Sequence, residues 1–212
     1  MATFHHKIGI LVAAASCALA SCSEPPVTPR RDSAPEEVKY TYEVGRDVKE
    51  IPGFSDYWKG AVEYNKFKTL LYNEEEKDKT SYRDLPLLLQ KKKEMGVAVD
   101  TATLQQMEKR LNAAIQFLKA ATETNPKFGR AFLVLGFSYY QLRRYEEALS
   151  AYRRVLEIHP KAANTYYSIA LCYLNMGKKK EALDCANEAL KIDPNNKEAR
   201  LLIDRISESN KR

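Results

Sequence analysis

Two consecutive copies of one 34-residue pattern occupy residues 129–196 of this 212-residue chain. Residues of the same kind recur 34 positions apart, as in Phe132 and Tyr166, Leu135 and Ile169, Gly136 and Ala170, Tyr139 and Tyr173, Ala148 and Ala182, Val155 and Ala189, and Pro160 and Pro194. A fixed period of this length is typical of arrays in which each unit buries its apolar face only when a neighbour stacks on it. The period therefore predicts a stack of supersecondary units.

Each copy divides into two helical segments, because its apolar residues recur at steps of three and four. The expected segments are 130–142, 145–158, 164–176 and 179–192. Turn-forming residues separate them, among them Pro160 and Gly177. Small residues are predicted where the paired antiparallel helices approach closely, at Gly136, Ala148, Ala170 and Ala182.

The first copy carries Phe132-x-x-Leu135-Gly136-x-x-Tyr139, then Ala148-x-x-x-Tyr152 and Pro160. This pattern resembles the tetratricopeptide repeat, with Phe in place of the usual Trp. The second copy resembles it too and departs at Ala186, where an aromatic residue is usual. The resemblance implies an all-α fold, an α-solenoid of antiparallel helix pairs. Its expected parts are repeats at 129–162 and 163–196, a degenerate helix pair at 97–128 and a capping helix in 197–212.

The N-terminus has the pattern of an exported protein. Ile8–Ala20 is an apolar or small stretch of thirteen residues, too short to span a bilayer, so residues 1–21 are predicted to be a signal peptide. Leu19-Ala20-Ser21-Cys22 resembles the bacterial lipobox, which implies cleavage before Cys22 and a diacylglycerol on its thiol. Ser23, and not Asp, follows the cysteine, which favours the outer membrane. Ordinary signal cleavage, leaving Cys22 as a free thiol, is the alternative.

Residues 22–39 are rich in Pro and Ser and have no apolar period, so we expect a disordered tether there. Residues 40–96 form a helical N-terminal region without assignment, with candidate helices at Phe54–Asn73 and Asp84–Met95. Trp58 is predicted to be a core residue. The charged runs Glu74–Glu76 and Lys91–Lys93 are predicted to be solvated helix ends, turns or loops.

Catalytic chemistry is poorly represented in the chain. His159 is the only histidine outside the signal peptide, no phosphate-binding loop is present, and no cofactor or metal is expected. Residues 129–212 hold 15 basic and 10 acidic side chains, which favours anionic lipid or an acidic partner, since an exported chain rarely meets nucleic acid. Cys172 and Cys185 are interpreted as small buried residues or as a disulfide pair.

The resemblance implies a concave groove lined by the first helix of each repeat. The residues expected to line this groove are Arg130, Leu133, Phe137, Tyr140 and Gln141 from the first copy, and Asn164, Tyr167, Leu171, Leu174 and Asn175 from the second. The Lys, Asn and Arg constellation with which some members of the family clamp a peptide carboxylate is absent, so an amphipathic helix or an extended apolar segment fits better. In the alternative, residues 40–96 fold back and fill the groove.

Together these patterns predict a membrane-anchored, non-catalytic adaptor or scaffold in a cell-envelope assembly, such as one that builds outer-membrane proteins, pili or secretion pores. Its expected partner is a protein or peptide of the envelope, and its expected location is the periplasmic face of the outer membrane. Two other functions stay open: an envelope hydrolase or its regulatory subunit, and a structural lipoprotein that only self-associates.

Overall fold

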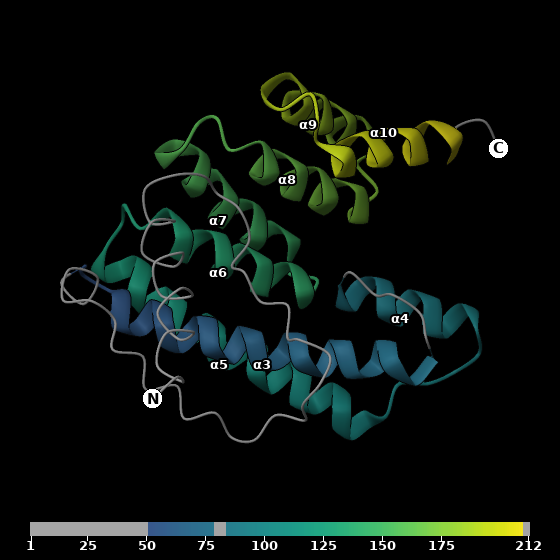
Figure 1. Ribbon diagram of the computed structural model, residues 1–212, viewed down its shortest axis with the longest axis horizontal. Helices are drawn as coiled ribbons and strands as arrows, with labels where there is room; N and C mark the ends of the chain where they lie inside the picture. The colour runs from purple at the N-terminus through teal and green to yellow at the C-terminus, as the bar shows by residue number, and fades with distance from the viewer. Residues whose placement is uncertain (1–50, 79–83, 210–212) are drawn as a thin grey trace, which may run out of the picture. The chain divides into compact units, whose positions relative to one another are not determined.

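The computed structural model describes residues 51–78 and 84–209. These residues form helices joined by turns and contain no strand, so the predicted all-α class is confirmed. The helices, labelled in Figure 1, are α3 (Phe54–Asp78), α4 (Leu85–Glu94), α5 (Thr101–Thr124), α6 (Gly129–Gln141), α7 (Tyr145–Ile158), α8 (Ala163–Asn175), α9 (Lys179–Ile192) and α10 (Lys197–Ser209).

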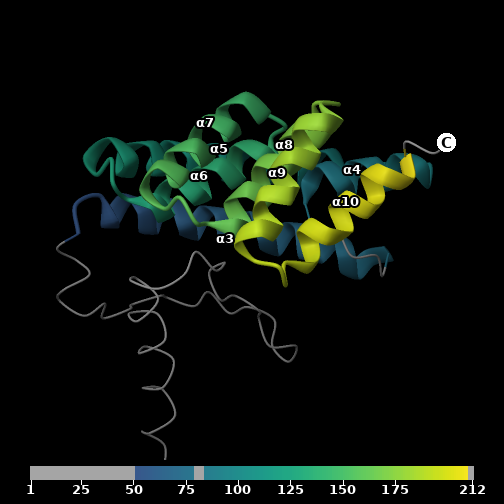
Figure 2. The ribbon, with the colours of Figure 1, turned by 90° about the horizontal axis from the view of Figure 1, so that it is seen from above.

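The described helices belong to one compact unit, Pro52–Arg212. Within it they stack in order: α3 packs on α5, α5 on α6, and each later helix on the one before it. Figures 1 and 2 show this succession from two sides. The four helices of the two repeat copies, α6 to α9, begin and end within one residue of the predicted positions. α10 confirms the helix expected after the second copy.

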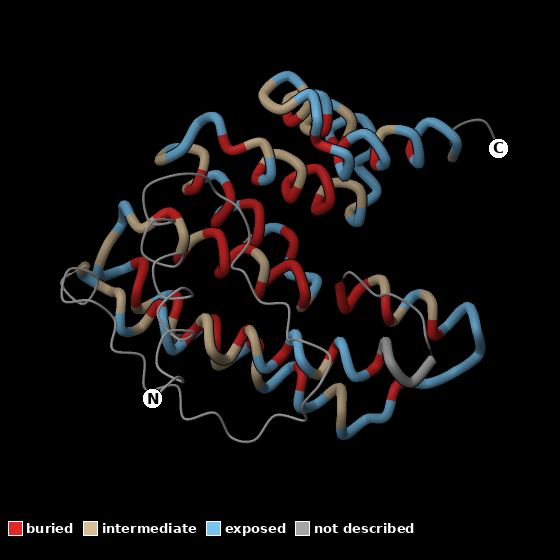
Figure 3. Tube along the Cα trace, in the orientation of Figure 1, coloured by how far each residue is buried: buried red, intermediate tan, exposed pale blue. Residues whose placement is uncertain are grey.

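Small residues allow the paired helices to lie close together, as predicted. Ala148, Ala170 and Ala182 are completely buried. A Cβ atom added at Gly136 would collide with the ring of Tyr152 on the partner helix α7. Figure 3 shows the resulting arrangement, with buried residues on the inward sides of the helices and exposed residues on their outer sides.

The two turns inside the repeats have the same backbone conformation with different residues. Gly177 lies in the α8–α9 turn with φ of 78°, a left-handed conformation that suits glycine. Arg143 occupies the equivalent position, 34 residues earlier, with φ of 60°. An arginine in this region carries backbone strain, since its Cβ approaches the following carbonyl oxygen.

The prediction of a helix pair over 97–128 is wrong. One continuous helix, α5, covers Thr101–Thr124, and Asp100 caps it by accepting a hydrogen bond from the amide of Thr103 at 3.0 Å. Its buried stripe, which includes Met107, Leu111, Ala114 and Leu118, continues without a break. The helix that pairs with α5 is α3, which lies more than twenty residues earlier in the chain.

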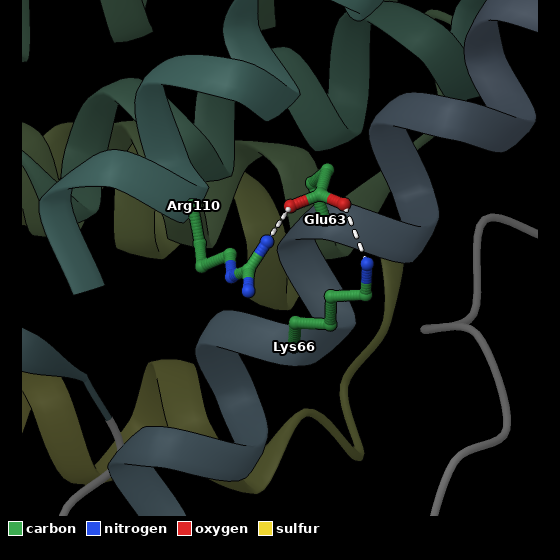
Figure 4. Close-up of polar contacts among 3 residues, drawn as sticks. All are labelled: Glu63, Lys66 and Arg110. Atoms are coloured by element: carbon green, nitrogen blue, oxygen red, sulfur yellow. Dashed lines mark hydrogen bonds and ion pairs between the residues drawn. The ribbon is translucent and has the colours of Figure 1, made fainter. Parts of the chain in front are cut away.

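Close packing also joins α3 and α5. A Cβ at Gly60 of α3 would lie 2.6 Å from Cγ of Leu118 on α5, so the two helices touch where this glycine leaves room. Figure 4 shows a polar link between the same helices: Glu63 accepts hydrogen bonds from Lys66 at 2.7 Å and from Arg110 of α5 at 3.0 Å.

The first helix pair is much longer than the repeats. α3 and α5 have 25 and 24 residues, against 13 and 14 for α6 and α7. At 1.5 Å per residue, the difference is about 15 Å or more. α4 lies along this additional length, because Lys92 near its end pairs with Glu74 near the end of α3 at 3.7 Å.

Three side chains in this region differ from the sequence interpretation. Glu74 and Lys92 were expected in solvent, yet both are buried, at 3% and 6% exposure, because they pair with each other between α3 and α4. Trp58 was expected in the core, yet it is 37% exposed and stacks on Phe54 at the start of α3. Spacing along a helix does not determine which neighbour covers which face.

The predicted signal peptide (1–21), the tether (22–39) and the lipid-attachment residue Cys22 lie outside the described residues. Among the helices that are described, none combines the length and the apolar character required to cross a bilayer.

Candidate functional site

The residues expected to line a groove on the first repeat are mostly inaccessible. On α6, Leu133, Tyr140 and Gln141 are buried, and Arg130 and Phe137 are half-buried. A peptide therefore cannot reach this part of the expected surface unless other elements move.

α3 covers the first part of α6. The ring of Tyr64 on α3 stacks on Phe137, with ring centroids 6.5 Å apart and planes 20° from parallel. Tyr57, two turns earlier on α3, packs against Phe128 at 4.9 Å. Burial raises the pKa of the Tyr57 phenol, and the nearby guanidinium of Arg130 offsets part of that rise. α3 and α6 therefore run side by side in the same direction.

The start of α4 covers the end of α6. The hydroxyl of Tyr140 donates to the Asp84 carboxylate at 3.3 Å, and the amide of Leu85 donates to Oε1 of Gln141 at 2.8 Å. Asn175 of α8 adds a further bond, donating from Nδ2 to the Tyr140 hydroxyl at 3.0 Å. Two of the predicted groove residues, Tyr140 and Gln141, thus bind a segment of the same chain.

The expectation of an open groove along α6 is therefore corrected. In the alternative, residues 40–96 fold back and fill the groove, and the described part of that region does so at α6, where residues of α3 and α4 occupy the surface. Single-sequence periodicity could not reveal this, since it reports which face of a helix is apolar and not what covers that face.

The corresponding face of α8 is more accessible. Asn164 and Asn175 are exposed, Tyr167 and Leu174 are half-buried, and only Leu171 is buried among the predicted groove residues there. The accessible part of the predicted surface therefore lies on the second repeat.

This face continues onto α10, which the sequence interpretation treated as a cap. Residues 34 apart occupy equivalent positions in a stack of like units. Leu133, Tyr167 and Leu201 form one such row, and their exposure rises from buried to half-buried to 68%. Leu201 is the binding candidate that the sequence interpretation missed, and the period itself, 34 residues beyond Tyr167, was the signal.

A pair of asparagines links α8 to α10. Asn196 caps α10 by accepting from the amide of Ala199 at 2.9 Å, and its Nδ2 donates to Oδ1 of Asn164 at 3.0 Å. Because both side chains are held by these bonds, the starts of the two helices keep a defined separation. We call the surface formed by Asn164, Tyr167, Leu174, Leu201 and Arg205 the α8–α10 face.

Comparison with known proteins agrees with the repeat geometry. A family model of the tetratricopeptide repeat matches residues 128–195, about a third of the chain. This part of the chain therefore matches the tetratricopeptide repeat. Tetratricopeptide repeats are in general protein-interaction modules that present a concave surface. No curated protein matches the sequence.

Several solved structures are similar to part of this chain. The first such domain of Spaghetti (RPAP3), bound to the HSP90 peptide SRMEEVD, is 18% identical, with 50% of this chain and 83% of that chain covered and a TM-score of 0.47. MamA is 23% identical, with 51% of this chain and 67% of the MamA chain covered and a TM-score of 0.46. The tetratricopeptide repeat domain of Arabidopsis OM64 is 21% identical, with 46% of this chain and 81% of the OM64 chain covered and a TM-score of 0.44.

Reactive groups in and around the tetratricopeptide repeats are few. Among the described residues, no group of three or more His, Cys, Asp and Glu side chains is arranged to hold a metal. Cys172 and Cys185 are free thiols, so the disulfide alternative does not hold. Burial raises the pKa of Cys172 to about 12, which keeps this thiol protonated and unreactive at neutral pH. His159 is exposed in a turn beside Gly129.

Proposed function

We propose that this protein is a lipid-anchored adaptor of the bacterial cell envelope, which holds a protein partner on its tetratricopeptide repeats. The lipobox-like Leu19-Ala20-Ser21-Cys22 supports the anchor, and the family match supports the binding role. A non-catalytic role is part of the proposal, because tetratricopeptide repeats are in general interaction modules. Its location would be the periplasmic face of the outer membrane, in an assembly that builds outer-membrane proteins, pili or secretion pores.

The observation that carries the binding proposal is the row of Tyr167 and Leu201. Leu201 is 68% exposed, the highest value among the large apolar residues described as exposed. An exposed leucine one repeat after a half-buried tyrosine resembles the anchor pair of an interface centre, while Asn164 and Arg205 supply a polar rim. Such a surface fits the apolar side of an amphipathic helix or an extended apolar segment.

Replacement of both anchors tests this proposal. The double variant Tyr167→Ala and Leu201→Ala should lose partner capture in a crosslinking experiment in intact cells, by ~2 kcal/mol or more for a central anchor. Val97→Ala is the matched control, because Val97 is also exposed, at 50%, and lies outside the α8–α10 face. Equal capture by the double variant and the control would exclude the α8–α10 face as the binding surface.

The anchor has a separate test. Cys22→Ala should abolish incorporation of a fatty-acid analogue and leave an unprocessed precursor, since the thiol is the expected site of attachment and processing. Cys185→Ala keeps the number of cysteines equal and should be labelled normally. Equal label on the Cys22→Ala chain would show that the protein is not a lipoprotein.

A further inference from the structure

The contact between α4 and α6 has the chemistry of helix recognition. The first turn of a helix leaves its backbone amides without partners inside the helix. In α4, the Asp84 carboxylate accepts from the amide of Leu87 at 2.9 Å, and Gln141 accepts from the amide of Leu85. The hydroxyl of Tyr140 binds the second oxygen of the Asp84 carboxylate. Tyr140 and Gln141 therefore recognise two general features of a helix start, an acidic N-cap and a free amide.

Apolar contacts add a sequence pattern to this recognition. Leu85 and Leu88 are the first and fourth residues after the N-cap Asp84. They are buried, at 4% and 0% exposure, and belong to the common hydrophobic core. They lie one turn apart on the same side of α4. The site that α4 fills thus accepts a helix that begins with Asp-Leu-x-x-Leu.

Position also distinguishes α4 from the rest of the stack. Its first residue bonds to the last residue of α6, and its Lys92 pairs with Glu74 on α3. α4 therefore continues the line of α6 along α3, end to end, as Figure 1 shows. α6 and α4 together occupy the place that one long helix would occupy. The chain does not run directly from the end of α6 into α4, so no covalent link between these two helices is required here.

α4 is the shortest of the described helices and depends on its contacts with the rest of the domain. It has ten residues, and helices shorter than about 12–15 residues are marginal without tertiary support. After α4 the chain passes through Met95, Gly96 and Val97, all exposed. Local opening of such an element needs less free energy than unfolding of the whole domain.

We propose that α4 is an internal ligand of the site formed by Tyr140, Gln141 and Glu74 of α3, and that this site also accepts an external helix that begins with Asp-Leu-x-x-Leu. The external helix would displace α4. This second binding position shares no residue with the α8–α10 face.

A synthetic peptide with the sequence of residues 84–95 is the probe. In the full chain, Asp84→Ala removes the cap of α4 and its bond to Tyr140, so α4 should yield the site more easily. The labelled peptide should bind this variant about tenfold or more tightly than it binds the parent, which is the effect of one hydrogen bond to a charged group. Tyr140→Phe in the Asp84→Ala background should reverse the gain, as should replacement of Asp by Ala in the peptide.

Asp100→Ala is the matched control, because Asp100 caps α5 in the same manner and its loss should not open the α4 site. Equal peptide affinities for the parent and Asp84→Ala would overturn the proposal. If Asp84→Ala does not fold, hydrogen exchange of the parent tests whether α4 opens separately from the rest of the domain. The amides of α4 should exchange by local opening while those of α5 stay protected. Exchange of both helices at the rate of global unfolding would show that α4 is a permanent part of the core and would overturn the proposal. Neither measurement involves the α8–α10 face, so failure here leaves that proposal standing.

Discussion

At the scale of single residues, Arg143 shows that the two repeats form the same turn with different amounts of backbone strain. Arg143 and Gly177 are equivalent, and both have positive φ, but only glycine adopts this conformation without steric strain. The left-handed region costs a non-glycine residue roughly 1–2 kcal/mol. Glycine in turn loses about 0.5–1 kcal/mol through its larger freedom in the unfolded chain.

Arg143→Gly should therefore raise the free energy of unfolding by about 0.5–1 kcal/mol. Urea denaturation measures this as a higher midpoint with an unchanged slope. Gly177→Arg is the reciprocal change and should lower the midpoint, although nothing lies within 4 Å of the added Cβ. An unchanged or lower midpoint for Arg143→Gly would contradict the role of backbone strain at this turn.

Tyr140 and Tyr167 illustrate a second point about residues. They look alike in the repeat pattern as groove aromatics, yet Tyr140 is 5% exposed with hydrogen bonds to Asp84 and Asn175, whereas Tyr167 is half-buried. Truncation of Tyr140 should thus lower stability before it affects any partner. The difference comes from α4, whose contacts with α6 join residues 56 positions apart and leave no trace in local periodicity.

At the scale of elements, the polar link between α3 and α5 makes stability depend on pH. Burial alone would raise the pKa of Glu63, but hydrogen bonds from Lys66 and Arg110 outweigh it and hold the pKa below its ordinary value of 4.5. A carboxyl with a lowered pKa stabilises the fold fully above its unfolded value and loses that effect as pH falls through its folded value.

Glu63→Gln should accordingly destabilise the domain by up to about 1 kcal/mol near neutral pH. The difference from the parent should shrink as pH falls from 4.5 through the lowered pKa of Glu63, because the parent carboxyl then loses its charge. Thermal or urea unfolding between pH 7 and 3 measures this difference in the free energy of unfolding. Asp56→Asn, which removes an exposed pair with Lys59 on α3 alone, is the control and should have a smaller effect. A difference that stays constant down to pH 3 would exclude the ionic link.

At the scale of the whole molecule, the features that could be predicted from the sequence are those of the two repeat copies. Helix pairs, turns and close contacts such as Gly136 were predictable, because they depend on local spacing and on comparison of one copy with the next. The pairing of α3 with α5 was not, since these helices share no repeat pattern. The same holds for the buried pair of Glu74 and Lys92, whose residue types ordinarily indicate solvent.

The last helix protects the end of the stack. Ala199, Leu202 and Ile206 of α10 are buried, and α10 packs on α9. Removal of residues 197–212 should uncover the apolar side of α9 and cause self-association, which sedimentation velocity measures. A chain that ends at residue 209 keeps all of α10 and is the control. A truncated chain that stays monomeric and folded would show that α10 is not required as a cap.

The unequal helix lengths have a consequence for how this protein can change during evolution. Copying a 34-residue unit after residue 162 reproduces contacts that the stack already contains. Copying one between α5 and α6 would separate Tyr64 from Phe137 and Leu85 from Gln141, and the short copy would leave half of α3 uncovered. Lineages that gain or lose repeats should therefore differ on the C-terminal side of the first repeat, while the segment from α3 to α6 is inherited as a single piece.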